Sequence, residues 1–477
     1  MASVDEVTTI ASDPSGTGGA VSKTVTIASG GQWLFAVCWG YNNSFSSGDV
    51  KDGANSWGAP TAVFANPSNS DRLAIFSKWF ASAGSVTVTL QPASVTYHCL
   101  HVIRCTAKSN AKLQATAGNH ANSTTPTDTT TLTPPSQTAA SIAIACLTHN
   151  SGNPTISAGT GYTLSAKQEN YGGAVQPGAG DYRVTSSNAA QTGAFSLSAA
   201  VEWSIATVLL SEPPAIYAVE GGGGNGYVDN NATDTITLPW TIPSNQGLVV
   251  CVEGFYAYDF SASFLSDSGS HTWTQKAFET WGNVGAVGSR DASTGQYVVN
   301  TTNNVTTASV STITLNASSV STDDPAAGKW YRWGVLVVEQ PDLTNGFATA
   351  TSANNSQANV TVVAPGSVTP ATNSTLTVMT FCDRGHASSL EPVTWSAEVN
   401  DTTLLYTGTE NSAHQSGSRG AKQTTATTAL SPTCTLNAQS VGARSTVMSY
   451  NVAGGTTGAG LPPKFQSSQP YHRRVAA

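Results

Sequence analysis

The chain has 477 residues and a formal net charge of −8, but only 10% of its residues are charged. That share is less than half the usual one, and an acidic, charge-poor chain does not fit a nucleic-acid-binding protein. The 11 Trp, 14 Tyr and 13 Phe, together with regular apolar alternation, exclude a disordered chain.

The first residues, MASVDEVTTIASDPSGTGG, have neither the basic nor the apolar segment of a secretory signal peptide. No apolar stretch approaches the length of a membrane span. We therefore expect synthesis in a cytosol and no membrane insertion. The seven cysteines form no C-x-x-C pair, so we expect buried free thiols rather than a disulfide framework.

An apolar strand with a cysteine near its end is predicted four times. These cysteines are 108, 105 and 131 residues apart, which is the length of a whole β-sandwich domain. The four positions are Cys38, Cys146, Cys251 and Cys382.

Two further strands follow each of these in a fixed order. A late strand alternates apolar and small residues, which predicts one buried face; its central residues are Val88, Phe195, Ile313 and Cys434. An apolar strand then closes each repeat, at residues 99–105, 203–210, 333–339 and 445–452. We read four diverged copies of one fold.

The predicted fold class is all-β, with four tandem antiparallel β-sandwich (jelly-roll-like) domains and an extended C-terminal arm. Prolines at 213, 214 and 341 mark short joints. The predicted domains are residues 1–107, 108–213, 214–341 and 342–455, followed by the arm at 456–477.

Domains one and three share a turn motif, in KDGANSW (Lys51–Trp57) and SDSGSHTW (Ser266–Trp273). Asp-Gly and Asp-Ser-Gly favour a tight turn into a strand that opens near Trp. The likeness between domains one and three indicates that an ancestral tandem pair of domains was duplicated, while four independent copies remain an alternative.

The arm, residues 456–477, has three prolines, three cations and no acidic residue, beside an acidic body. It suits arm exchange between identical neighbours or docking on an acidic surface, with a disordered tail as the alternative. The predicted partner-binding residues of the arm are Lys464, Phe465, Tyr471, His472, Arg473 and Arg474.

Residues with metal-ligand side chains gather in YHCLHVIRC, at His98, Cys99, His101 and Cys105. On an extended strand the two cysteines would be roughly 20 Å apart, too far for one tetrahedral zinc site. We expect a structural strand and no metal. An acid-rich loop is a weaker alternative for calcium, at Asp229, Asn230, Asn231 and Asp234, with Asp323 and Asp324 in a second loop.

No catalytic constellation accompanies the remaining polar residues. Gly221–Gly226 lacks the Lys-Ser/Thr and the helix of a phosphate loop. His120, His386 and His414 lie near serines without any fixed-spacing motif. We therefore expect a protein that is not an enzyme and binds no cofactor.

Aromatic residues at strand ends or in loops could stack on sugars or fill a core, and the sequence leaves both open. They are Trp39, Tyr41, Trp57, Tyr227, Tyr256 and Tyr258.

The early apolar strand, the TVTL-like strand, the closing strand and the Asp-Gly turn before Trp together resemble the jelly-roll modules in structural proteins of tailed bacteriophage virions. The resemblance covers all four domains and implies a virion component made in the bacterial cytoplasm, a capsid decoration protein or a tail or fibre part. Its implied partners are copies of itself, other virion proteins and host surface glycans. The alternative is a carbohydrate-binding adhesin or receptor-binding protein.

Overall fold

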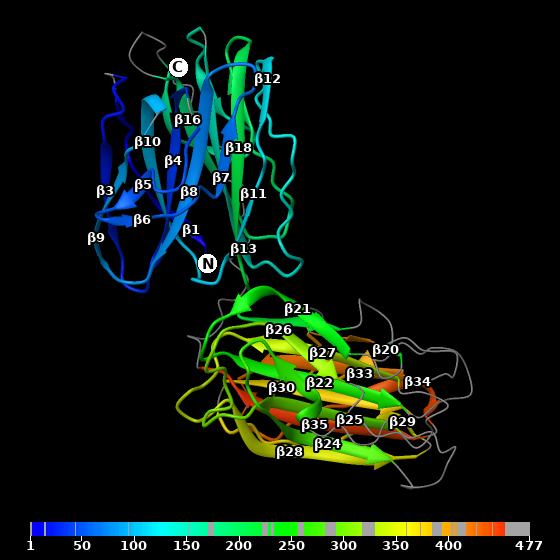
Figure 1. The fold of residues 1–477 in the computed structure, drawn as a ribbon. Helices are drawn as coiled ribbons and strands as arrows, with labels where there is room; N and C mark the ends of the chain where they lie inside the picture. The colour runs from blue at the N-terminus through cyan, green and yellow to red at the C-terminus, as the bar shows by residue number, and fades with distance from the viewer. Residues whose placement is uncertain are drawn as a thin grey trace, which may run out of the picture. The chain divides into compact units, whose positions relative to one another are not determined.

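The computed structural model describes residues 2–453, except for 14–15, 43, 94, 151, 170–175, 222–227, 230–232, 256–261, 282–291, 317–329, 359, 373, 384–393, 402–403, 405, 408–415, 426 and 441. The chain divides into two compact units, Met1–Pro214 and Ala215–Ala477 (Figure 1). Both units are built from antiparallel sheets, which confirms the predicted all-β class. The helix within the described ranges is one 3₁₀ turn, η1 (Ala262–Phe264).

The first unit begins with a large and a small sheet that enclose one core. The first large sheet has the order β1 (Ser3–Val7), β10 (Val95–Thr106), β4 (Gln32–Asn42), β8 (Asp71–Phe80) and β7 (Ala62–Ala65), with β2 (Ala11–Ser12) on β10. The first small sheet has the order β3 (Val21–Ile27), β9 (Gly84–Leu90), β5 (Val50–Asp52) and β6 (Asn55–Ser56). We call the two together the first sandwich.

The second sandwich repeats this plan. Its large sheet has the order β11 (Lys112–Ala115), β18 (Val201–Glu212), β13 (Ala140–His149), β16 (Gly178–Thr185) and β15 (Thr163–Gln168), with β12 (Asn119–Ser123) on β18. Its small sheet pairs β14 (Ile156–Ala158) with β17 (Phe195–Leu197).

The second unit contains the third and fourth sandwiches. The third large sheet has the order β19 (Ile216–Glu220), β27 (Trp330–Val338), β22 (Gly247–Phe255), β25 (Ala292–Val299) and β24 (Trp273–Trp281), with β20 (Val228–Asp229) on β27. The third small sheet has the order β21 (Thr233–Ile242), β26 (Val310–Asn316) and β23 (Leu265–Asp267).

The fourth sandwich completes this unit. Its large sheet has the order β28 (Ala348–Gln357), β35 (Ala443–Asn451), β30 (Thr375–Asp383), β33 (Ser416–Thr424) and β32 (Tyr406–Thr407). Its small sheet has the order β29 (Val360–Val363), β34 (Cys434–Ser440) and β31 (Thr394–Trp395).

The predicted repeat of strands is confirmed. The cysteine strand pairs with the closing strand at the centre of every large sheet, in the registers Cys38↔Leu100, Cys146↔Ala206, Cys251↔Gly334 and Cys382↔Arg444. The late strand lies in the small sheet each time, and its predicted central residue is buried. Because two compact units are resolved, the division into four domains stays a prediction.

The two large sheets of each unit pack face to face. One core joins Phe35, Val37 and Ile103 of the first large sheet to Ile144 and Val208 of the second. In the second unit, Val249 and Leu336 meet Leu376, Val378 and Met448. The cysteine strands therefore bury both faces, which explains their nearly continuous apolar runs. All seven cysteines are free and buried, as predicted.

Candidate functional site

The outward face of the first small sheet is covered by hydroxyl groups. The side chains of β3 alternate, so that Val25 and Ile27 enter the core while Ser22, Thr24 and Thr26 face solvent. Thr24 lies opposite Thr87, and their hydroxyl oxygens are 2.9 Å apart; the Ser22 and Thr89 oxygens are 2.8 Å apart. Such pairs stabilise neighbouring strands. The face is dominated by hydroxyl groups and includes one cation, Lys51, which lies opposite Thr89.

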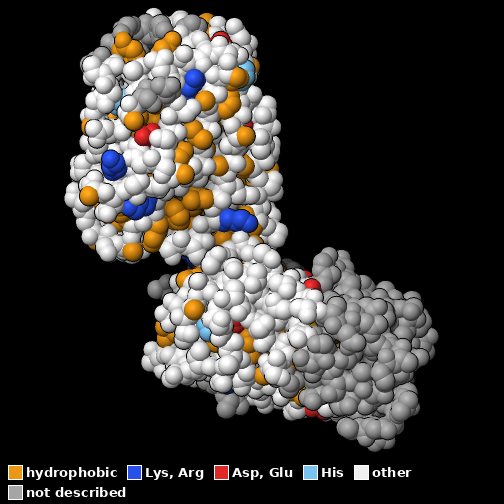
Figure 2. All heavy atoms as spheres, viewed as in Figure 1, with side chains coloured by type: hydrophobic (Ala, Val, Ile, Leu, Met, Phe, Trp, Pro, Cys, Tyr) orange, Lys and Arg blue, Asp and Glu red, His pale blue; other side chains and the backbone are white. Residues whose placement is uncertain are grey.

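The third small sheet has the same outward face. Thr233, Thr235 and Thr237 are exposed on β21, and the Thr235 and Thr314 hydroxyl oxygens are 3.0 Å apart. We call the two surfaces, each in its own unit, the hydroxyl faces. On the side of the molecule in Figure 2, charged side chains are sparse among uncharged ones. Few charges would have to be desolvated if another molecule covered such a surface.

Polar groups close one edge of the interface between the first and second sandwiches. The Gln176 amide donates to Asp71 Oδ1 at 2.8 Å and to the His149 carbonyl at 2.8 Å, and the Trp39 indole donates to the Gln176 carbonyl at 2.9 Å. Asp71 is fully buried, and this burial raises its pKa to about 7. The side chain of Gln176 thus gives the buried acid a partner from the other sandwich.

A histidine and a serine also meet across this interface. The buried His101 ring lies 2.9 Å from the Thr8 carbonyl through Nδ1 and 2.9 Å from the Ser165 hydroxyl through Nε2. Nδ1 therefore carries the proton and donates it to Thr8, while Nε2 accepts from Ser165. Burial lowers the His101 pKa to about 4, so the ring stays neutral at physiological pH. Its hydrogen bonds make it a structural contact between the sandwiches.

The interface between the third and fourth sandwiches changes character along its strands. At one end it is apolar, with Phe347 stacked on Tyr450. In the middle, the Thr294 hydroxyl donates to Thr380 at 2.7 Å, and the Gln296 amide donates to Thr446 at 3.0 Å. At the other end lie buried or partly buried charged side chains: Glu220, Glu253, Arg332, Arg419 and Arg444.

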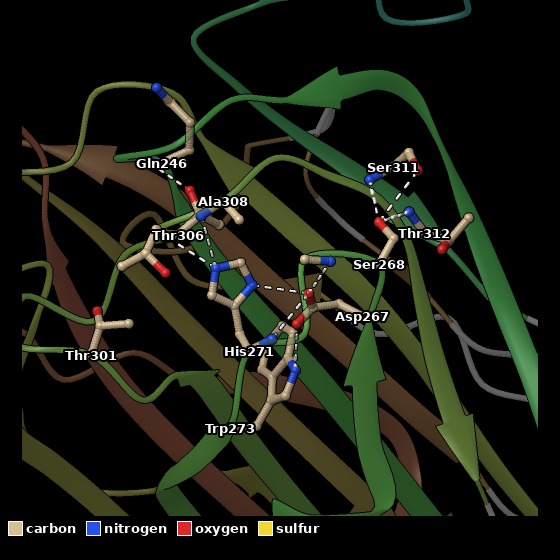
Figure 3. A network of polar contacts seen from close by, with 12 residues as sticks. Gln246, Asp267, Ser268, His271, Trp273, Thr301, Thr306, Ala308, Ser311 and Thr312 are labelled. Carbon is tan, nitrogen blue, oxygen red and sulfur yellow. Dashed lines mark hydrogen bonds and ion pairs between the residues drawn. The ribbon is translucent and has the colours of Figure 1, made fainter.

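The turn motif of the third sandwich contains a buried acid–imidazole pair (Figure 3). Asp267 Oδ1 lies 2.9 Å from His271 Nδ1, and Asp267 Oδ2 accepts the Trp273 indole N–H at 3.0 Å. His271 Nε2 accepts the backbone N–H of Thr307 at 2.9 Å. Because both imidazole nitrogens are occupied, this pair fixes the turn and leaves no nitrogen for proton transfer to a substrate.

The cluster of metal-ligand side chains lies where the sequence predicts, on the single strand β10. His98, Cys99, His101 and Cys105 are all buried there. Burial raises the Cys99 pKa to about 12, so its thiol stays protonated and is a poor metal ligand. Within the described ranges, no group of three or more His, Cys, Asp or Glu side chains is placed to hold a metal ion.

The other candidates divide into structural contacts and positions outside the description. Asp234 accepts the Trp333 indole N–H at 2.6 Å, and His120 stacks on Phe64 with ring centroids 5.9 Å apart. Side-chain contacts of Asp229 are not described. The following lie outside the described residues: Asn230, Asn231, Asp323, Asp324, His386, His414, and the arm residues Lys464, Phe465, Tyr471, His472, Arg473 and Arg474.

The aromatic candidates are mostly part of the core. Trp39 and Trp57 are 0% and 8% exposed, so neither ring presents a stacking surface. Tyr41 is partly exposed. Tyr227, Tyr256 and Tyr258 lie outside the described residues.

No family model matches the chain, and no curated protein matches it significantly. In the part of the chain that the structure describes, no helix has both the length and the apolar character needed to span a membrane.

Proposed function

We propose that this chain is a non-enzymatic structural protein of a tailed-bacteriophage virion, on the outer surface of the capsid or tail. In this role it is made in the bacterial cytoplasm and is incorporated during assembly. Its sandwich surfaces and its C-terminal arm contact copies of itself and other virion proteins.

The hydroxyl faces are the main support for a role in assembly. Sheets exposed to solvent usually carry charged side chains, which oppose association with other protein molecules. Here Thr24, Thr87, Thr235 and Thr314 form uncharged rows instead. A flat face with few charges loses little solvation free energy when it is covered, so it suits contact with another subunit.

The buried polar clusters add a second line of support. Asp267 and His271 stabilise a turn, and Asp71 and His101 each form hydrogen bonds across an interface between two sandwiches. The hydrogen bonds of these side chains are made within the fold, which is the pattern of structural rather than catalytic polar groups.

The test is light scattering with size-exclusion chromatography on the intact chain and on a chain cut before Thr456. We expect an intact oligomer that becomes a monomer on truncation. A monomer in both cases would contradict self-assembly through the arm and would favour the alternative, a carbohydrate-binding adhesin, which a glycan array then tests.

The virion assignment needs its own experiment. The purified chain should co-sediment with the phage particles, and deletion of residues 456–477 should abolish this binding. Retained binding after deletion would contradict the role of Lys464, Phe465, Tyr471, His472, Arg473 and Arg474. The absence of binding by the intact chain would contradict the virion assignment itself.

A further inference from the structure

The interface of the third and fourth sandwiches has one end that is covalently linked and one that is charged. Residues 339–347 connect the sandwiches at the apolar end, where Phe347 packs on Tyr450. Glu253, Arg332, Arg419 and Arg444 lie near the opposite ends of their strands. The charged groups are therefore far from the segment that connects the two sandwiches.

Two acids of the third sandwich face an arginine of the fourth. Arg419 on β33 forms an ion pair with Glu220 on β19. Its guanidinium lies against Gly334 on β27, where a Cβ would collide with it. Glu253 on β22 also interacts electrostatically with Arg419, and Arg332 lies directly opposite Glu253 in the sheet. Because Gly334 has no side chain, it leaves room for the Arg419 guanidinium against the large sheet of the third sandwich.

Glu253 is the poorly satisfied member of this group. It is 0% exposed, and neither carboxyl oxygen has a hydrogen-bond partner among the described residues. A buried carboxylate without hydrogen bonds is strongly disfavoured, even beside arginines. The charged groups that act on it are Arg419 from β33, Glu220 from β19 and Arg332 from β27.

We propose that Glu220, Glu253, Arg332 and Arg419 form a pH-sensitive latch, which opens the third and fourth sandwiches about their apolar, covalently linked end as the pH rises. When the sandwiches separate, water hydrates the Glu253 side chain, so its carboxyl group can lose the proton. Glu279 of β24 adds an edge contact, because its Oε2 accepts from Asn354 of β28 at 2.6 Å, and opening must separate these two groups as well.

The sign and size of the effect follow from proton linkage. Burial raises the Glu253 pKa from 4.5 to about 7, so the closed form binds more protons than the open form between these values. The contribution of Glu253 to the stability of the closed form is therefore fully present below pH 4.5 and is lost as the pH rises through 7. For one group with this shift, the opening constant increases about tenfold between pH 6 and pH 8.

Two cysteines report opening separately from unfolding. Cys382 lies at the latch, where its thiol donates to the Gly254 carbonyl of the other sandwich at 3.3 Å. Cys434 lies in the fourth sandwich's own core with Phe381 and Trp395. Latch opening exposes the first thiol only, whereas unfolding of the fourth sandwich exposes both.

The experiment measures the alkylation rates of Cys382 and Cys434 in the full chain by mass spectrometry at pH 6 and pH 8, each divided by the rate of the same thiol in the urea-unfolded chain at that pH. We expect the normalised Cys382 rate to exceed that of Cys434 at both pH values, to rise about tenfold from pH 6 to pH 8 in the wild type and to stay constant in Glu253→Gln. Asp71→Asn, a change in a buried carboxyl of the other unit, should leave the wild-type rise unaltered. A normalised Cys382 rate that is equal at both pH values in the wild type would overturn the proposal, and so would a full rise in a folded Glu253→Gln variant or equal normalised rates for Cys382 and Cys434.

Discussion

Asp267 and His271 form a buried pair, 2.9 Å apart, with side chains that are 0% and 3% exposed. The corresponding acid of the first sandwich, Asp52, instead forms a partly buried ion pair with Lys78 at 2.8 Å, with side chains that are 17% and 30% exposed. The same turn motif therefore encloses one acid completely and leaves the other in contact with solvent, and the two should differ in their contributions to stability.

Asp267→Asn should destabilise the third sandwich by about 1–3 kcal/mol, because one of its buried hydrogen-bond acceptors is replaced by a donor. Scanning calorimetry would show a lower melting temperature for one transition. Asp52→Asn is the matched control, and we expect less than about 1 kcal/mol for it since ion pairs in contact with solvent contribute little. Equal effects of the two changes would contradict this account.

Asp71 should make the first unit less stable as the pH rises. Its pKa is raised by burial from 3.8 to about 7, so the folded form binds the extra proton, and stability is lost between these values. The slope reaches about 1.4 kcal/mol per pH unit. His101, with its pKa lowered to about 4, acts in the opposite direction below pH 6.5.

These two effects can be separated by comparing the wild type with Asp71→Asn. The difference in unfolding free energy between the proteins should change steadily from pH 5 to pH 7, as measured by urea denaturation. A difference that is constant with pH would show that Asp71 is ionised in the folded state.

Gly193→Ala should destabilise the second sandwich by about 1–3 kcal/mol. A Cβ at Gly193 would collide with the hydroxyl of Thr207, which donates to the buried Asp128 at 2.9 Å. In Gly19→Ala, the control, the added Cβ makes ordinary contact 3.7 Å from Asp13. Thermal unfolding of both variants tests this, and a control as destabilised as Gly193→Ala would count against the steric explanation.

Thr87→Arg should reduce self-association without unfolding the protein. Thr87 is exposed on the hydroxyl face of the first sandwich, so we expect a stability change within about 0.5 kcal/mol. A charge there opposes burial of the face, and light scattering should show a smaller mass. Thr87→Ser is the control. An unchanged mass in Thr87→Arg would remove this face from the proposed assembly contacts.

Much of the fold follows from local patterns. The strands around Cys38 and Cys146 are mostly apolar, and the late strands around Val88 and Ile313 alternate with period two. Both patterns are local and are found in the structure. The turn before Trp273 could also be predicted, because Asp-Ser-Gly chemistry acts within a few residues.

The interdomain sites could not be predicted in the same way. Gln176 meets Asp71 from 105 positions away, and Arg419 faces Glu253 across two sheets. One available signal was the presence of charged residues such as Glu253 and Arg332 at the ends of otherwise apolar strands. Their partners depend on which sheet faces meet, and no local spacing encodes that.

The sequence by itself determined the all-β class, the repeated strands and the burial of the cysteines, because hydrophobic alternation and strand length are properties of short segments. Only the tertiary structure decided that the large sheets pack face to face in pairs. It also decided that Glu253 is enclosed with arginines from both sandwiches, because burial and its effect on a carboxyl group depend on surfaces brought together from distant parts of the chain.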